Sequence, residues 1–107
     1  MAVVKWNVSA PDKVKPGEQF TVTVEVYAYP ATPVKAIINL FGKTYNKQGT
    51  ASSPYAPLRL SFLVTAPTQP GTYTGSVSLY EYSDIIISGP KPIVPLPSPS
   101  PGEVMIQ

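Results

Sequence analysis

Apolar and polar residues alternate along most of this chain, and proline and glycine interrupt the alternation at short intervals. Alternation with a period of two is typical of a β-strand that buries one face. It predicts strands at residues 3–9, 20–28, 34–41, 58–65 and 72–82. Because no window shows an amphipathic helical pattern, the sequence indicates an all-β chain.

The inward faces of these strands follow from the same alternation. The strand at residues 20–28 is the clearest, because Thr and Glu separate its apolar residues. The residues expected to point inward are Val4, Trp6, Val8, Phe20, Val22, Val24, Val26, Ala28, Val34, Ala36, Ile38, Leu40, Leu58, Leu60, Phe62, Val64, Tyr73, Gly75, Val77 and Leu79. Several short strands with frequent turn signals indicate an antiparallel sandwich or barrel, and we favour a sandwich with facing inner surfaces about 10 Å apart.

The middle of the chain is more polar. We expect a turn at Gly42-Lys43, a short strand at residues 44–46 and a polar loop at residues 47–57. A length of 107 residues fits one domain.

Composition restricts the chemistry. The sequence has no His and no Cys, which removes the usual triads, disulfides and structural zinc sites. A net charge of +2 is too small to indicate a nucleic-acid or membrane partner, and no segment has the length of a membrane helix. We therefore expect no enzyme activity and no cofactor.

Six acidic residues remain as candidates for catalysis or cation binding. They are Asp12, Glu18, Glu25, Glu81, Asp84 and Glu103. The closely spaced pair Glu81 and Asp84 has the oxygen ligands that a hard cation prefers. We interpret all six as solvated charges on strands and loops, since exposed sheet edges usually carry charge, and we predict no metal site.

Two phrases in the chain resemble prokaryotic immunoglobulin-like modules. The first is Val14-Lys-Pro-Gly-Glu-Gln-Phe-Thr-Val-Thr-Val24, and the second is Ala66-Pro-Thr-Gln-Pro-Gly-Thr-Tyr-Thr74. The likeness is to CARDB-like and fibronectin-III-like surface domains and covers residues 3–82. It implies an immunoglobulin-like sandwich of about seven strands and transfers no catalytic residue. We also expect Tyr73 to form a tyrosine corner, with its hydroxyl bonded to nearby backbone.

Tyrosine is abundant, with seven residues in the chain. Six of them are expected on outward faces or in loops: Tyr27, Tyr29, Tyr45, Tyr55, Tyr80 and Tyr82. Exposed Tyr side chains anchor protein interfaces or stack on sugars, whereas the plainer interpretation is cross-strand pairing. We predict an interface patch that combines Tyr27, Tyr80 and Tyr82.

The C-terminal part is rich in proline. Six prolines fall between Gly89 and Pro101, which favours polyproline II and excludes a central strand. We predict a sandwich at residues 1–88, with an edge strand at residues 84–88, and a proline-rich arm at residues 89–107 that ends in a possible short strand. The arm is expected to lie along its own sandwich or along a neighbouring subunit. Its expected anchors are Ile93, Val94, Leu96, Val104 and Ile106.

These features favour a non-enzymatic structural protein that binds protein partners, either copies of itself or a capsid or filament subunit. The N-terminus has no export signal, so we expect a virion component such as a capsid decoration or tail protein, or a filament subunit. The alternative is an extracellular or cell-surface adhesion module, with carbohydrate as a possible ligand.

Overall fold

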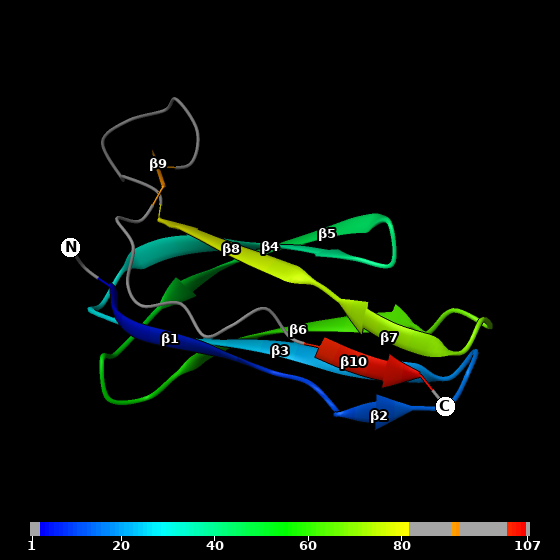
Figure 1. Cartoon of the computed structure of the whole chain (residues 1–107). Helices are drawn as coiled ribbons and strands as arrows, with labels where there is room; N and C mark the ends of the chain where they lie inside the picture. The colour runs from blue at the N-terminus through cyan, green and yellow to red at the C-terminus, as the bar shows by residue number, and fades with distance from the viewer. Residues whose placement is uncertain (1–2, 82–90, 93–102, 107) are drawn as a thin grey trace.

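The computed structural model describes residues 3–81, 91–92 and 103–106. These residues form strands and connecting turns and loops (Figure 1). The strands are β1 (Val3–Ser9), β2 (Lys13–Val14), β3 (Gln19–Ala28), β4 (Thr32–Leu40), β5 (Lys43–Ala51), β6 (Leu58–Thr65), β7 (Gly71–Thr74), β8 (Ser76–Glu81), β9 (Lys91–Pro92) and β10 (Glu103–Ile106). No helix that could cross a membrane occurs in these ranges.

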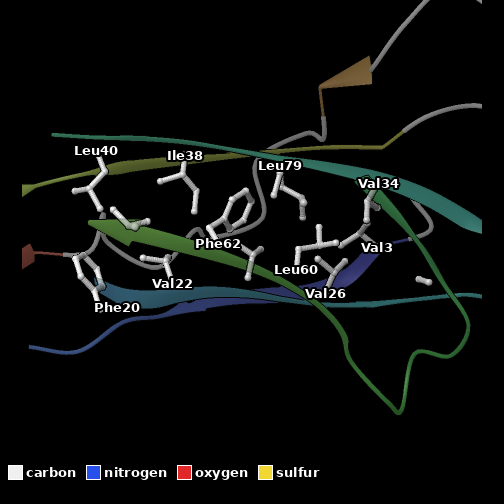
Figure 2. Close-up of a cluster of buried hydrophobic side chains, with 14 of the residues drawn as sticks. Val3, Phe20, Val22, Val26, Val34, Ile38, Leu40, Leu60, Phe62 and Leu79 are labelled. Carbon is white, nitrogen blue, oxygen red and sulfur yellow. The ribbon is translucent and has the colours of Figure 1, made fainter. Parts of the chain in front are cut away.

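Two antiparallel sheets enclose the core. One has the order β1-β3-β6 and the other the order β5-β4-β8-β9. Figure 2 shows apolar side chains from both sheets meeting between them. The most deeply buried large side chains are Val24, Val26, Val34, Ile38 and Val64. The predicted all-β sandwich and the inward faces of β3 and β4 are therefore confirmed.

A third, smaller sheet holds the C-terminal strand. β10 lies between β2 and β7, parallel to β2 and antiparallel to β7. The last strand thus pairs within its own chain, and both of its edges have a neighbour. Pro92 lies in β9, which pairs with β8 as the last strand in its sheet, a position that tolerates a residue without an N–H. The predicted edge strand at residues 84–88 and the domain boundary at residue 88 lie outside the described residues.

The two phrases that carry the family resemblance meet in space. Pro16 and Gly17 form a turn closed by a 3.0 Å hydrogen bond from the Glu18 N–H to the Lys15 carbonyl, and Gly17 has the φ of +76° that a type II turn requires. The Gly17 N–H also donates to the Pro67 carbonyl at 3.2 Å. A residue from each phrase therefore takes part in the contact between the start of β3 and the end of β6.

The predicted tyrosine corner is confirmed. The Tyr73 hydroxyl donates to the Gln69 carbonyl oxygen at 2.7 Å. The Tyr73 ring also packs edge-on against Phe41, with 5.2 Å between ring centroids, and Phe41 packs edge-on against Phe20 at 6.0 Å. These contacts tie the β4–β5 hairpin to β3 and β7, with Phe41 held at a positive φ of 55° in the two-residue turn before Lys43.

Three predicted boundaries were wrong. β5 continues to Ala51 instead of ending at residue 46, because residues that are polar in sequence pair with β4 along its whole length. β4 begins at Thr32, two residues before its predicted start, and ends at Leu40, so that Phe41 lies in the turn. The predicted strand at residues 72–82 is divided at Gly75, where a Cβ atom would lie 2.9 Å from Leu40 Cδ1.

Two side-chain orientations also differ from the prediction. A bulge between Val3 and Lys5 turns Val3 into the core and leaves Val4 48% exposed. Tyr45, expected on an outward face, packs against the core, since it pairs with the inward-facing Ile38. Both differences come from pairing register, which alternation alone does not specify.

Candidate interaction surfaces

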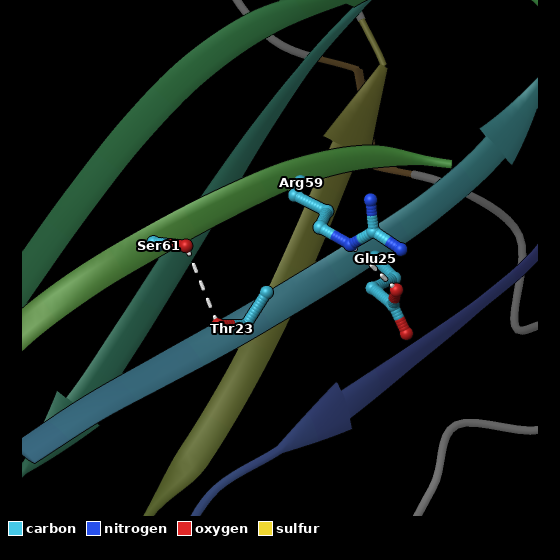
Figure 3. A network of polar contacts seen from close by, with 4 residues as sticks. All are labelled: Thr23, Glu25, Arg59 and Ser61. Atoms are coloured by element: carbon cyan, nitrogen blue, oxygen red, sulfur yellow. Dashed lines mark hydrogen bonds and ion pairs between the residues drawn. The ribbon is translucent and has the colours of Figure 1, made fainter. Parts of the chain in front are cut away.

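The outer face of the β1-β3-β6 sheet carries charges that have partners within the chain. Arg59 Nε lies 3.0 Å from Glu25 Oε2 across the β3–β6 pair, and Thr23 and Ser61 are joined by a 3.3 Å hydrogen bond beside them (Figure 3). Lys5 Nζ lies 4.5 Å from the centroid of the Tyr27 ring. Because the Arg59 side chain is largely exposed, this ion pair contributes about 0–1 kcal/mol.

The outer face of the other sheet is different in chemistry. Its cross-strand rows are set by the register of β5, β4 and β8, and we call this surface the neutral face. Lys35 is the one charged residue among the outward positions of these three strands, because Glu81 pairs with buried Val34 on the opposite side. The outward positions are Pro33, Lys35, Ile37, Asn39, Thr44, Asn46, Gln48, Thr50, Ser76, Ser78 and Tyr80.

An open depression lies where the neutral face meets the β4–β5 hairpin. Its volume is about 520 Å³, within the range of small-molecule sites. Asn39, Thr44 and Ser76 line it and form one row across the three strands. Thr44 Oγ1 donates to Asn39 Oδ1 at 2.6 Å. Phe41, from the hairpin turn, and the exposed Lys43 that follows it also line the depression.

Exposed apolar side chains gather at the opposite end of the sandwich, which we call the apolar end. Tyr29 is 55% exposed in the turn between β3 and β4, and Tyr55 is 91% exposed in the loop between β5 and β6. These two connections lie at the same end (Figure 1), where the Ala31 N–H donates to the Ala51 carbonyl at 3.0 Å. Val4 belongs here too, since its neighbour Val3 pairs with Ala28.

The predicted interface residues do not form one patch. Tyr27 lies on the outer face of the β1-β3-β6 sheet, whereas Tyr80 pairs with Lys35 on the neutral face. The expectation of a shared patch was therefore wrong, because the two strands belong to opposite layers. Val104 and Ile106 lie in β10, where the register pairs them with Tyr73 and Gly71. Tyr82, Ile93, Val94 and Leu96 lie outside the described residues, and their interface role stays a prediction.

The sequence predicted neither the exposure of Val4 nor the grouping of exposed apolar residues at this end. Tyr29 and Tyr55 carried a signal, since both follow or precede proline in a connection. Val4 carried none, because the bulge that turns it outward has no mark in the alternation.

The acidic candidates are dispersed. Glu25 faces Arg59 on one sheet, and Glu81 ends β8 on the other. The prediction that Glu81 is a solvated charge was wrong, because its Oε2 is buried and has no hydrogen-bond partner among the described residues. Asp84, the expected partner of Glu81, lies outside the described residues. Within residues 3–81 and the two described C-terminal segments, no three residues of the types His, Cys, Asp and Glu lie together as a metal site requires.

Comparison with known proteins gives a likeness of structure. A scan against protein families and a comparison with curated proteins found no match. Among solved structures, the chain is similar to a CARDB domain from Pyrococcus furiosus, which was crystallised in complex with di-metal ions. The TM-score is 0.61 at 17% sequence identity, over 99% of this chain and 90% of that one. This chain has the fold of a CARDB domain.

The CARDB-like fold is an immunoglobulin-like β-sandwich, as the two sequence phrases indicated. At 17% identity the likeness concerns the fold, and the metal ions are a property of the Pyrococcus domain.

Proposed function

We propose that this chain is a non-enzymatic structural module that assembles with copies of itself through the apolar end. The setting that we propose is a virion surface, as a capsid decoration or tail component, or a filament. An extracellular adhesion module is the alternative setting for the same fold.

The observation that carries this proposal is the location of Val4, Tyr29 and Tyr55 at one end of the sandwich. Three of the four large hydrophobic side chains that are exposed in the described part of the chain lie at this one end. Tyr is enriched in protein interfaces, because its ring supplies a large rigid contact and its hydroxyl a polar one. Tyr29 and Tyr55 lie on connections held by a rigid sandwich, which is a typical location for binding residues, and Val4 of β1 adds exposed apolar surface at the same end.

In this proposal the C-terminal segment does not make the first contact between subunits, as the sequence had suggested, but adds to it. The backbone of β10 pairs with β7 over all four of its residues and with β2 at Met105 and Ile106, which leaves little of its edge for a neighbouring subunit. We therefore assign the first contact between subunits to the apolar end. The arm's predicted anchors Ile93, Val94 and Leu96 would add contacts beyond it.

Sedimentation of the full chain over a range of concentrations tests this proposal. We expect reversible assembly, and we expect the double variant Tyr29→Ala/Tyr55→Ala to weaken it at least about tenfold, since truncating central interface aromatics typically costs more than 1 kcal/mol. Tyr80→Ala, on the neutral face, is the matched control and should assemble as the wild type does.

Two results would contradict the proposal. One is a wild-type chain that remains monomeric at every concentration. The other is a loss of assembly in Tyr80→Ala as large as in the double variant. Thermal unfolding of each variant shows that the comparison is made between folded proteins.

A further inference from the structure

We propose that the neutral face, together with the depression at its end, binds an uncharged polysaccharide. This site is independent of the assembly proposed above, because it lies on the outer surface of one sheet and the apolar end lies at the loops. The inference rests on the kind of polar group that the face presents and on its shape.

The row at the depression supplies an amide and two hydroxyls side by side. Asn39 lies between Thr44 and Ser76 in the register of the three strands. Amide and hydroxyl groups both donate and accept hydrogen bonds without carrying charge, as sugar hydroxyls do. All three residues are exposed, so these groups are accessible to a ligand. The row therefore matches the chemistry of a saccharide ring.

Two further rows extend this chemistry along the strands. They hold Asn46, Ile37 and Ser78, and then Gln48, Lys35 and Tyr80. The third row is about 13 Å from the first, at about 3.3 Å per residue of strand. Tyr80, which is half-buried and pairs with Pro92 of β9, supplies the aromatic ring at this far end, and the apolar face of a sugar can stack on its exposed part. The face thus has polar groups at one end and an aromatic group at the other, which suits an extended ligand.

The small number of charged side chains on the neutral face argues against nucleic acids, membranes and proteins as its ligands. Nucleic acids and anionic membranes bind through several lysines or arginines, whereas the outward positions of β5, β4 and β8 hold one lysine, Lys35, and the depression adds Lys43. A protein surface commonly presents charges of both signs. The outward positions of β5, β4 and β8 offer no carboxylate with which the cations of such a partner could pair. The outer face of the β1-β3-β6 sheet differs, since its Arg59 and Glu25 already pair with each other. An uncharged polymer of hydroxyls is the ligand that this face fits.

The experiment measures binding of the full chain to soluble hydroxyethyl cellulose, amylose and galactomannan by affinity electrophoresis and calorimetry, with polygalacturonate as the anionic comparison. We expect binding to at least one neutral polymer that is insensitive to salt. Tyr80→Ala and the double variant Asn39→Ala/Ser76→Ala should each weaken it about tenfold, which corresponds to about 1.4 kcal/mol. Thermal unfolding confirms that each variant is folded.

Matched controls on other surfaces of the molecule show whether binding is confined to the neutral face. Tyr27→Ala, on the opposite sheet, and Tyr29→Ala/Tyr55→Ala, at the apolar end, should bind the polysaccharide as the wild type does.

The inference is overturned by absence of binding to all three neutral polymers. It is also overturned by preference for polygalacturonate or by an equal loss of binding in Tyr27→Ala. If the chain binds a protein through Tyr80 and binds no polysaccharide, the inference is wrong and the neutral face is a protein-docking surface. Because assembly is read by sedimentation with different residues, a failure here leaves the proposed function untouched.

Discussion

Single residues at turns and corners determine how the strands of this sandwich connect. Phe41 and Ala31 both have positive φ, a conformation that glycine or asparagine adopts more easily than other residues. Edge-on contacts with Phe20 and Tyr73 hold the Phe41 ring. Ala31 has a side chain too small for such compensation, so its turn carries strain that substitution can relieve.

We predict that Ala31→Gly stabilises the chain. Ala31 has a φ of 60° in the turn closed by the Thr32 N–H and the Tyr29 carbonyl. Removing the Cβ relieves the left-handed strain, while the entropy of an unfolded glycine offsets part of the gain, which leaves about 0.5–1 kcal/mol. Chemical denaturation measures the free energy of unfolding. Ala56→Gly, at a loop position without positive φ, should give no gain, and a destabilised Ala31→Gly would show that the turn is unstrained.

The tyrosine corner gives a second prediction at this scale. Tyr73→Phe removes the hydroxyl that bonds to the Gln69 carbonyl and keeps the ring against Phe41. The free energy of unfolding should fall by about 1 kcal/mol, the usual contribution of one such bond. Tyr55→Phe, at a 91% exposed position, is the control and should be neutral. Equal melting temperatures for Tyr73→Phe and the wild type would show that the corner contributes nothing.

At the scale of the strand, the sequence predicted those strands in which apolar and polar residues alternate. β3 and β6 were found nearly to the residue, because one face of each is apolar and the other polar. β5 was mostly missed, since Lys47, Gln48 and Gly49 give no apolar alternation, and its pairing with β4 is a backbone property. The short strand at the end of the arm was predicted and is β10, but the third sheet that holds it was missed, because β2 has two residues and pairs with β10 across more than ninety residues of sequence.

The candidate surfaces show the same limit. Tyr80 was correctly expected on an outward face, but nothing in the alternation says which sheet a strand joins, so Tyr27 and Tyr80 were wrongly combined. The neutral face exists only through the register that places Thr44, Asn39 and Ser76 in one row.

β10 gives the prediction at this scale. Met105 lies in the middle of the third sheet, opposite Lys13 of β2 and Thr72 of β7. Met105→Pro removes a backbone N–H from a strand with neighbours on both sides, and we expect a loss of about 2 kcal/mol or more in the free energy of unfolding. Met105→Val keeps the N–H and serves as the control. A Met105→Pro chain as stable as Met105→Val would mean that β10 adds nothing to the sandwich.

At the scale of the whole molecule, we assign different functions to the apolar end and to the neutral face. The core between the two sheets holds the sandwich together, and the Gly17 N–H ties the turn before β3 to the segment that follows β6. We assign the apolar end, with Tyr29 and Tyr55, to assembly and the neutral face to an uncharged ligand. The central claim is that assembly buries the apolar end.

Hydroxyl-radical footprinting of the full chain below and above its assembly concentration tests that claim directly. Oxidation of the Tyr29 and Tyr55 side chains is predicted to fall several-fold on assembly. Leu63, which is 63% exposed on the outer face of β6, serves as the internal reference and should be oxidised equally in both samples. Unchanged oxidation of Tyr29 and Tyr55 in the assembled sample, or protection of Leu63 in their place, would contradict the claim.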